Sequence, residues 1–177
     1  MSSEIENLVK VIANATKSAF IDLFRNYEKF YYCALVTTEE ALPPFISAWS
    51  REALERTAKN KSIEFADDVK WSYADSPYCN YGEEYFKEVR EIFEKRPNIY
   101  DLDDELYDME FNLRINAMES AMKQLDNEGI FELNQPRKEV YINVEIMPPN
   151  FSNTERALRL NKKENITNWL NEATEEN

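Results

Sequence analysis

The chain of 177 residues contains no histidine, and it has only two cysteines and two glycines. Histidine is the one side chain whose unperturbed pKa lies near neutrality, and it is the commonest metal ligand. Its absence excludes Ser-His-Asp and Cys-His catalysis and histidine-ligated zinc. The scarcity of glycine argues against glycine-rich phosphate loops. Carboxylates, hydroxyls and aromatic rings suit binding at least as well as catalysis, so we expect no catalytic residue, no metal site and no cofactor.

Disulfide and membrane signals are equally sparse. Cys33 and Cys79 show no CxxC spacing, a pattern that favours two reduced, unpaired thiols. No run of about 18 apolar residues is long enough to cross a membrane. The first residues lack the basic and apolar regions of a signal peptide. These features predict a cytoplasmic protein.

Acidic side chains dominate the charge: 34 Asp and Glu face 21 Lys and Arg, which gives a net charge of −13. The chain is nevertheless 43% hydrophobic and 13% aromatic, enough for a buried core. Its length fits one domain, so we predict a single domain over residues 1–177 with a frayed tail at 172–177. Phosphate groups repel a net anion, which argues against nucleic acid and anionic membranes as partners. A basic protein is the electrostatically natural partner.

Hydropathy patterns predict an α+β fold, in which several helices cover a small, largely antiparallel sheet of about three or more strands. Helices are expected over 4–26, 50–60, 82–97 and 103–129 and after 152 and 161, with a short helical turn at 66–70. Strands are expected over 30–36, 45–49 and 140–146, and parallel pairing of the last strand is an alternative. The first strand lacks polar alternation, which predicts a central position. Strand 140–146 alternates strictly, so one face belongs to the core and the other is wet or functional.

The segment from Trp71 to Phe86 is the candidate functional surface, because aromatic and acidic side chains interleave along it. Aromatic side chains dominate interface hot spots, and carboxylates steer a basic partner. We predict a partner-binding surface made of Asp67, Asp68, Trp71, Tyr73, Asp75, Tyr78, Glu83 and Glu84. In the alternative interpretation, Trp71 and the tyrosines cover the core, and Asp75 and Ser76 only hold a turn.

Carboxylate chemistry has weaker support in the sequence. The densest acidic run, 101–110, holds six carboxylates and no base. It lacks the spacing of an EF-hand loop and suits the start of a helix, with a magnesium site as the alternative. Pairs such as Asp67 with Asp75 or Glu110 with Glu145 could act as acid and base, but 34 acids make chance pairings unavoidable. Arg114 is expected to pair with a buried acid.

Several strings of the chain resemble an uncharacterised bacterial family, the domain-of-unknown-function family 4303 (DUF4303). They are residues 30–38, 48–50, 70–78, 118–129 and 143–149, continued by 156–161. The resemblance spans nearly the whole chain and transfers no catalytic residue. Members of this family look like immunity proteins encoded beside bacterial polymorphic toxins. The resemblance therefore implies a toxin-binding role.

The leading hypothesis is a non-enzymatic bacterial immunity protein. It would bind a cognate, basic toxin domain through the acidic, aromatic-rich surface and occlude the toxin's active surface. One alternative is a carboxylate-dependent hydrolase with an Asp/Glu or magnesium site, which requires at least two acids in one concave pocket. Another is a regulatory or structural protein with no toxin partner.

Overall fold

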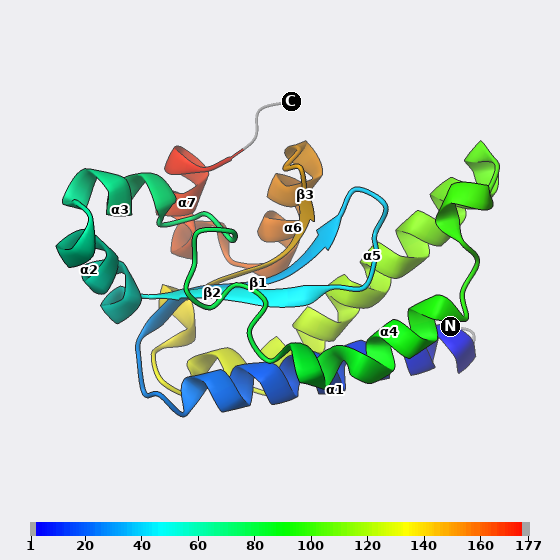
Figure 1. The fold of residues 1–177 in the computed structure, drawn as a ribbon, viewed down its shortest axis with the longest axis horizontal. Helices are drawn as coiled ribbons and strands as arrows, with labels where there is room; N and C mark the ends of the chain where they lie inside the picture. The colour runs from blue at the N-terminus through cyan, green and yellow to red at the C-terminus, as the bar shows by residue number, and fades with distance from the viewer. Residues whose placement is uncertain (1–2, 175–177) are drawn as a thin grey trace.

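A three-stranded sheet in the order β2-β1-β3 lies in the middle of the fold (Figure 1). The computed structural model describes residues 3–174. β1 (Phe30–Thr38) occupies the predicted central position, antiparallel to β2 (Phe45–Ser50) and parallel to β3 (Tyr141–Met147). The predicted α+β class is confirmed, and the sheet is mixed. The predicted antiparallel arrangement is confirmed for β1 and β2, and the parallel alternative is confirmed for β1 and β3.

One face of the sheet packs on the two longest helices, α1 (Ser3–Phe24) and α5 (Asp104–Asn127). These helices contact each other below the sheet in Figure 1, and α4 (Lys87–Glu94) runs along α1. The apolar residues of β3 that alternate along the strand point into this layer, with Ile142, Val144 and Ile146 all buried. This layer is the larger of the two cores.

The opposite face carries the second core, which is richer in aromatic rings. Tyr32, Trp49 and Tyr141 lie on it. It is covered by α2 (Arg51–Asn60), α3 (Ile63–Val69) and α7 (Thr167–Glu172). The polar residues of β3 also point to this side and are buried, so the expectation of a wet face is wrong. C-terminal helices cover a surface that the strand pattern alone leaves open to solvent.

β3 is an edge strand of the sheet. Side chains from α6 (Phe151–Leu160) and from the residue after it form hydrogen bonds with the outer backbone groups of β3. Asn161 donates to the Ile142 carbonyl at 2.7 Å and accepts from the Ile142 amide at 3.1 Å. Asn153 makes the same pair of bonds with Ile146, at 3.0 and 2.8 Å. Arg156 donates to a third β3 carbonyl at 2.8 Å. These side chains take the place of a further strand and protect the edge.

Two helices begin where the sequence predicted them, with caps at residues 50 and 103, whereas α6, expected after 152, is capped by Asn150. Ser50 accepts from the amide of Ala53 at the start of α2, and Asp103 caps α5 in the same way. Where the sequence predicted one helix over 82–97, the chain forms a 3₁₀ turn, η1 (Glu83–Phe86), before α4. The turn predicted at 66–70 is the longer α3. Part of the predicted frayed tail, 175–177, lies outside the described residues.

Gly129 ends α5 in the left-handed region, with φ at 75°. An added Cβ would lie 3.2 Å from the carboxylate of Glu132. Residues other than glycine and asparagine rarely adopt this backbone conformation. We expect Gly129→Ala to lower the free energy of unfolding by roughly 1 kcal/mol, and Gly129→Asn by less. Urea unfolding of both variants measures this difference. An alanine variant as stable as wild type would contradict the assignment of this cap.

Candidate functional site

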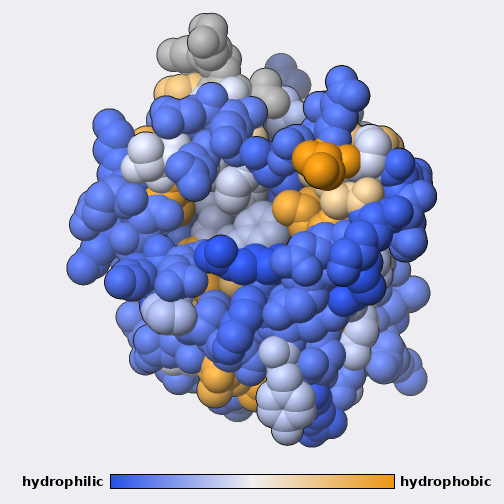
Figure 2. All heavy atoms as spheres, turned by 90° about the vertical axis from the view of Figure 1, so that its left-hand side faces the viewer, coloured by the Kyte–Doolittle hydropathy of each residue, from blue (hydrophilic) through white to orange (hydrophobic). Residues whose placement is uncertain are grey.

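Three adjoining hollows open beside the aromatic face of the sheet, and Trp71 lines all of them. Their volumes are about 420, 240 and 550 Å³. We call the three together the Trp71 groove. Figure 2 shows the side of the molecule where α2 and α3 lie, with a hollow of paler side chains in the middle of a mainly hydrophilic surface. Arg51 and Leu54 of α2 line the first hollow, so the groove opens on this side.

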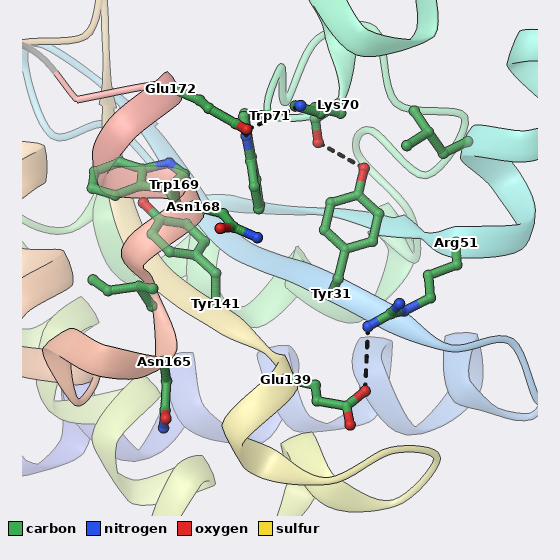
Figure 3. Close-up of a pocket in the computed structure, with 12 residues that line it drawn as sticks. Tyr31, Arg51, Lys70, Trp71, Glu139, Tyr141, Asn165, Asn168, Trp169 and Glu172 are labelled. Carbon is green, nitrogen blue, oxygen red and sulfur yellow. Dashed lines mark hydrogen bonds and ion pairs between the residues drawn. The ribbon is translucent and has the colours of Figure 1, made fainter. Parts of the chain in front are cut away.

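Aromatic rings form the walls of the hollow of about 420 Å³ (Figure 3). Trp71 directly follows Lys70, the C-cap of α3, and its ring packs edge-to-face with Tyr31 at 5.3 Å between centroids. Tyr141 from β3 stacks on Trp169 from α7 at 4.6 Å. The indole N–H of Trp71 donates to Glu172 at 2.7 Å, which holds the loop after α3 against the last helix. The walls therefore come from segments that are distant in sequence.

Carboxylates outnumber cations along the rim of the groove. Four carboxylates, from Asp67, Asp68, Glu139 and Glu172, face the cations Arg51 and Lys70. Lys70 lies 3.0 Å from Glu172 and Arg51 3.3 Å from Glu139. Hydrogen bonds from Trp71 and Lys70 lower the pKa of Glu172. The rim thus keeps a net negative charge after its ion pairs are counted.

Glu145 lies at the bottom of the smallest hollow and is only 5% exposed. The hydroxyl of Tyr32 donates to its Oε2 at 2.7 Å, and that of Tyr141 donates to its Oε1 at 3.0 Å. Burial raises the pKa of Glu145 to about 7, although both phenols and Arg156 oppose this rise. Burial also lowers the pKa of Arg156 to about 10. Burial thus brings the pKa of Glu145 close to neutrality.

The groove brings together four of the eight residues predicted to bind a partner. Asp67 and Asp68 are exposed at its rim, while Trp71 and Tyr73 are half-buried in its walls. Asp75 is exposed outside the hollows and accepts a hydrogen bond from Ser72 at 2.6 Å, as the turn-holding interpretation expects.

Tyr78 is half-buried in a hydrogen-bond network outside the groove. Its hydroxyl donates to Glu28 at 2.6 Å and accepts from Arg56 at 3.1 Å, and its ring packs on Phe30. Burial favours a higher pKa for Glu28, but the hydrogen bonds from Arg56, Ser50 and Tyr78 outweigh it and lower that pKa. This network ties the loop to the chain before β1 and to α2, which is the core-covering role of the alternative interpretation.

Glu83 and Glu84 are exposed in η1, which packs against α1 and not against the groove. The predicted surface is therefore divided. Asp67, Asp68, Trp71 and Tyr73 lie at the groove, the two glutamates of η1 lie in another region, and Asp75 and Tyr78 belong to the loop outside the groove.

Most residues that line the groove were not among the predicted site residues, and Glu145, Trp169 and Glu172 are the most important of them. Glu145 was named only in a possible acid–base pair with Glu110. The alternating pattern of 140–146 did mark the face that carries Glu145 as wet or functional. Trp169 was assigned only to a helix, and Glu172 was placed in the expected tail. Their role depends on contacts between the end of the chain and the loop after α3, for which the sequence holds no local signal.

The remaining acidic candidates lie apart from the groove. Glu110 on α5 forms ion pairs with Arg96 at 2.6 Å and Arg114 at 2.7 Å, which confirms that Arg114 pairs with a buried acid. Glu110 and Glu145 share no hollow. Within residues 3–174, no group of three or more histidine, cysteine or acidic side chains is arranged to hold a metal ion. No helix in that range is long and apolar enough to span a membrane.

The fold and the groove define a small α+β domain with a hollow that has aromatic walls and an acidic rim. The chain belongs to the family DUF4303, described as a domain of unknown function, whose model matches residues 12–162. The match includes all three strands, Trp71 and Glu145 and ends before α7. No curated relative and no solved structure shows significant similarity to the chain.

Proposed function

We propose that this protein is a non-enzymatic binding protein that takes up a basic region of a partner protein in the Trp71 groove. The observation that carries the proposal is the combination of aromatic walls with a rim of four carboxylates and two cations. Half-buried rings such as Trp71 and Tyr73 offer apolar area to a partner with little loss of side-chain entropy. Exposed carboxylates such as Asp67 and Asp68 add attraction at long range.

In its most specific form, the proposal is that the partner is a cognate toxin domain and that binding covers the active surface of the toxin. The net charge of −13 supports this form. This form is also what the resemblance to DUF4303 implies, while the family itself is described only as a domain of unknown function. A strongly acidic protein associates rapidly with a basic target, a useful property where free toxin must be captured quickly.

Co-expression with the protein encoded next to its gene tests this function. We expect the chain to restore growth and to co-purify with that protein, with less complex recovered in high salt than in low salt, because salt screens the charges of the rim. A complex that is unaffected by salt would contradict the electrostatic role of the rim. Absence of both rescue and complex would overturn the proposal.

Catalysis at Glu145 is a second candidate, favoured by its cavity and by its pKa of about 7, which suits a general acid or base. The amount of this protein that is needed to restore growth, relative to the amount of toxin, separates the two functions. A binding protein must match the toxin in amount, whereas an enzyme acts at a small fraction of that amount. We expect rescue to fail when expression falls below that of the toxin. Full rescue well below equal amounts would favour catalysis.

A further inference from the structure

The smallest hollow of the Trp71 groove has the composition of a cation-binding pocket. Its volume is about 240 Å³, and its lining includes the rings of Trp71, Tyr73 and Trp169 and the carboxyl of Glu145. Aromatic faces attract cations through their quadrupole, and this attraction grows when the cation leaves water. We propose that this hollow binds an alkylammonium group, with its charge at Glu145 and its methylene chain between the rings.

The arrangement around Glu145 favours an ammonium over a guanidinium. Tyr32 and Tyr141 each donate a hydroxyl, one to either carboxylate oxygen. A guanidinium binds a carboxylate best through two parallel bonds, one to each oxygen, and the phenols occupy part of that edge. An ammonium is a compact charge that needs only one free acceptor site on the carboxylate.

An unpartnered hydroxyl supplies a second, independent indication of a ligand. Thr154 lines the same hollow and is only 7% exposed, yet its Oγ1 has no hydrogen-bond partner. A buried hydroxyl without a partner is costly, and native proteins rarely keep one without a reason. Thr154 stands on α6 and lines the hollow together with Trp71 and Tyr73, so a rotation of its side chain toward a bound ligand can supply the missing bond.

Other charged and titratable groups near Glu145 leave it available to a cation. Tyr32 on β1 and Tyr141 on β3 face it directly. Arg156 approaches from α6, but its donors go to the Val144 carbonyl and to Asn153 rather than to Glu145. α7 and the loop after α3 contribute uncharged side chains to this hollow. No cation within the described residues therefore forms an ion pair with Glu145.

The inference deepens the proposed function and rests on it, because a lysine of a basic partner would be the source of the ammonium. A free alkylamine has the same chemistry. Titration of the whole protein with n-butylammonium, followed by tryptophan fluorescence, tests the pocket, since two of its walls are tryptophans. N-acetyl-Gly-Lys-Gly-amide is the second probe. Binding of both probes assigns the pocket to a lysine of a protein, and binding of butylammonium alone assigns it to a free amine.

Two variants and a neutral probe make the test specific. We expect Glu145→Gln to weaken butylammonium binding at least about tenfold, because the charge that pairs with the ammonium is lost. Thr154→Val keeps the shape of the side chain, breaks no hydrogen bond of the fold, and should weaken binding a few-fold. n-Butanol should bind much more weakly than butylammonium to wild type.

The affinity for butylammonium should also fall about tenfold between pH 8 and pH 6, because the pocket needs ionised Glu145, whose pKa is about 7. The inference is overturned if neither probe binds, if butanol binds as well as butylammonium, or if both variants bind like wild type. Any of these results leaves complex formation with the neighbouring gene product untouched. The pocket and the proposed function can therefore fail separately.

Discussion

Replacing Asn161 by leucine is expected to lower the free energy of unfolding by about 3 kcal/mol. The side chain is only 8% exposed, and its amide satisfies both the N–H and the carbonyl of Ile142 on the edge strand. It also accepts from Arg137 at 3.1 Å. Leucine has a similar size but leaves these groups buried without partners, at a cost of about 1–3 kcal/mol for each. Urea unfolding monitored by circular dichroism measures the loss.

Asn116→Leu is the matched control, because this asparagine is exposed on α5. The control should stay within about 0.5 kcal/mol of wild type, as surface substitutions usually do. Equal stabilities of the Asn161 and Asn116 variants would show that the edge of β3 does not depend on these side-chain bonds.

Glu145→Gln is expected to change how stability depends on pH. Burial raises the pKa of this carboxyl from 4.5 to about 7, so the folded state holds its proton more tightly than the unfolded state does. The contribution of this carboxyl to the free energy of unfolding is therefore greatest below pH 4.5. It falls as the pH rises from 4.5 to about 7, and it stays constant at higher pH. Glutamine stays neutral throughout. Between pH 5 and pH 8, wild type should lose roughly 2–3 kcal/mol relative to the variant.

Chemical unfolding of both proteins at several pH values measures this difference. Glu83→Gln is the control, since that carboxylate is exposed, and its profile should run parallel to that of wild type. Parallel profiles for wild type and Glu145→Gln would mean that the carboxyl is solvated or neutralised and would contradict the burial described above.

Much of the fold could be predicted because its signals are local. The apolar run 30–36 predicted a central strand, and the predicted helix limits at residues 50, 103 and 129 coincide with the caps Ser50, Asp103 and Gly129 of the structure. The parallel pairing of β3 is set by the long connection from β2 and by packing on α5 and α6, so the strand pattern left it open. Alternation along 140–146 identified a polar face but not its burial, which depends on helices further along the chain.

The candidate site was predicted in part for the same reason. Interleaved aromatic and acidic residues identified Trp71 and Tyr73, which do line the groove. The partner of the Trp71 indole, Glu172, stands 101 residues later in the chain, and no local pattern links the two. Tyr78 shares the composition of its neighbours but bonds inward to Glu28. Composition marks a segment, whereas long-range packing decides which of its side chains face a partner.

Two pairs of acids in the predicted surface allow the most direct test of the Trp71 groove as the binding site. Asp67→Asn/Asp68→Asn and Glu83→Gln/Glu84→Gln remove the same charge, but only the first pair lines the groove. Neither double substitution disturbs the aromatic core. The measurement is the calorimetric affinity of each variant for the protein that co-purifies with the chain, at low salt.

We predict that the aspartate variant binds at least about tenfold more weakly than wild type, and that the η1 variant stays within about threefold, as expected for charges at and away from an interface. Equal affinities of the two variants, or a larger loss for the η1 variant, would contradict the groove as the binding site.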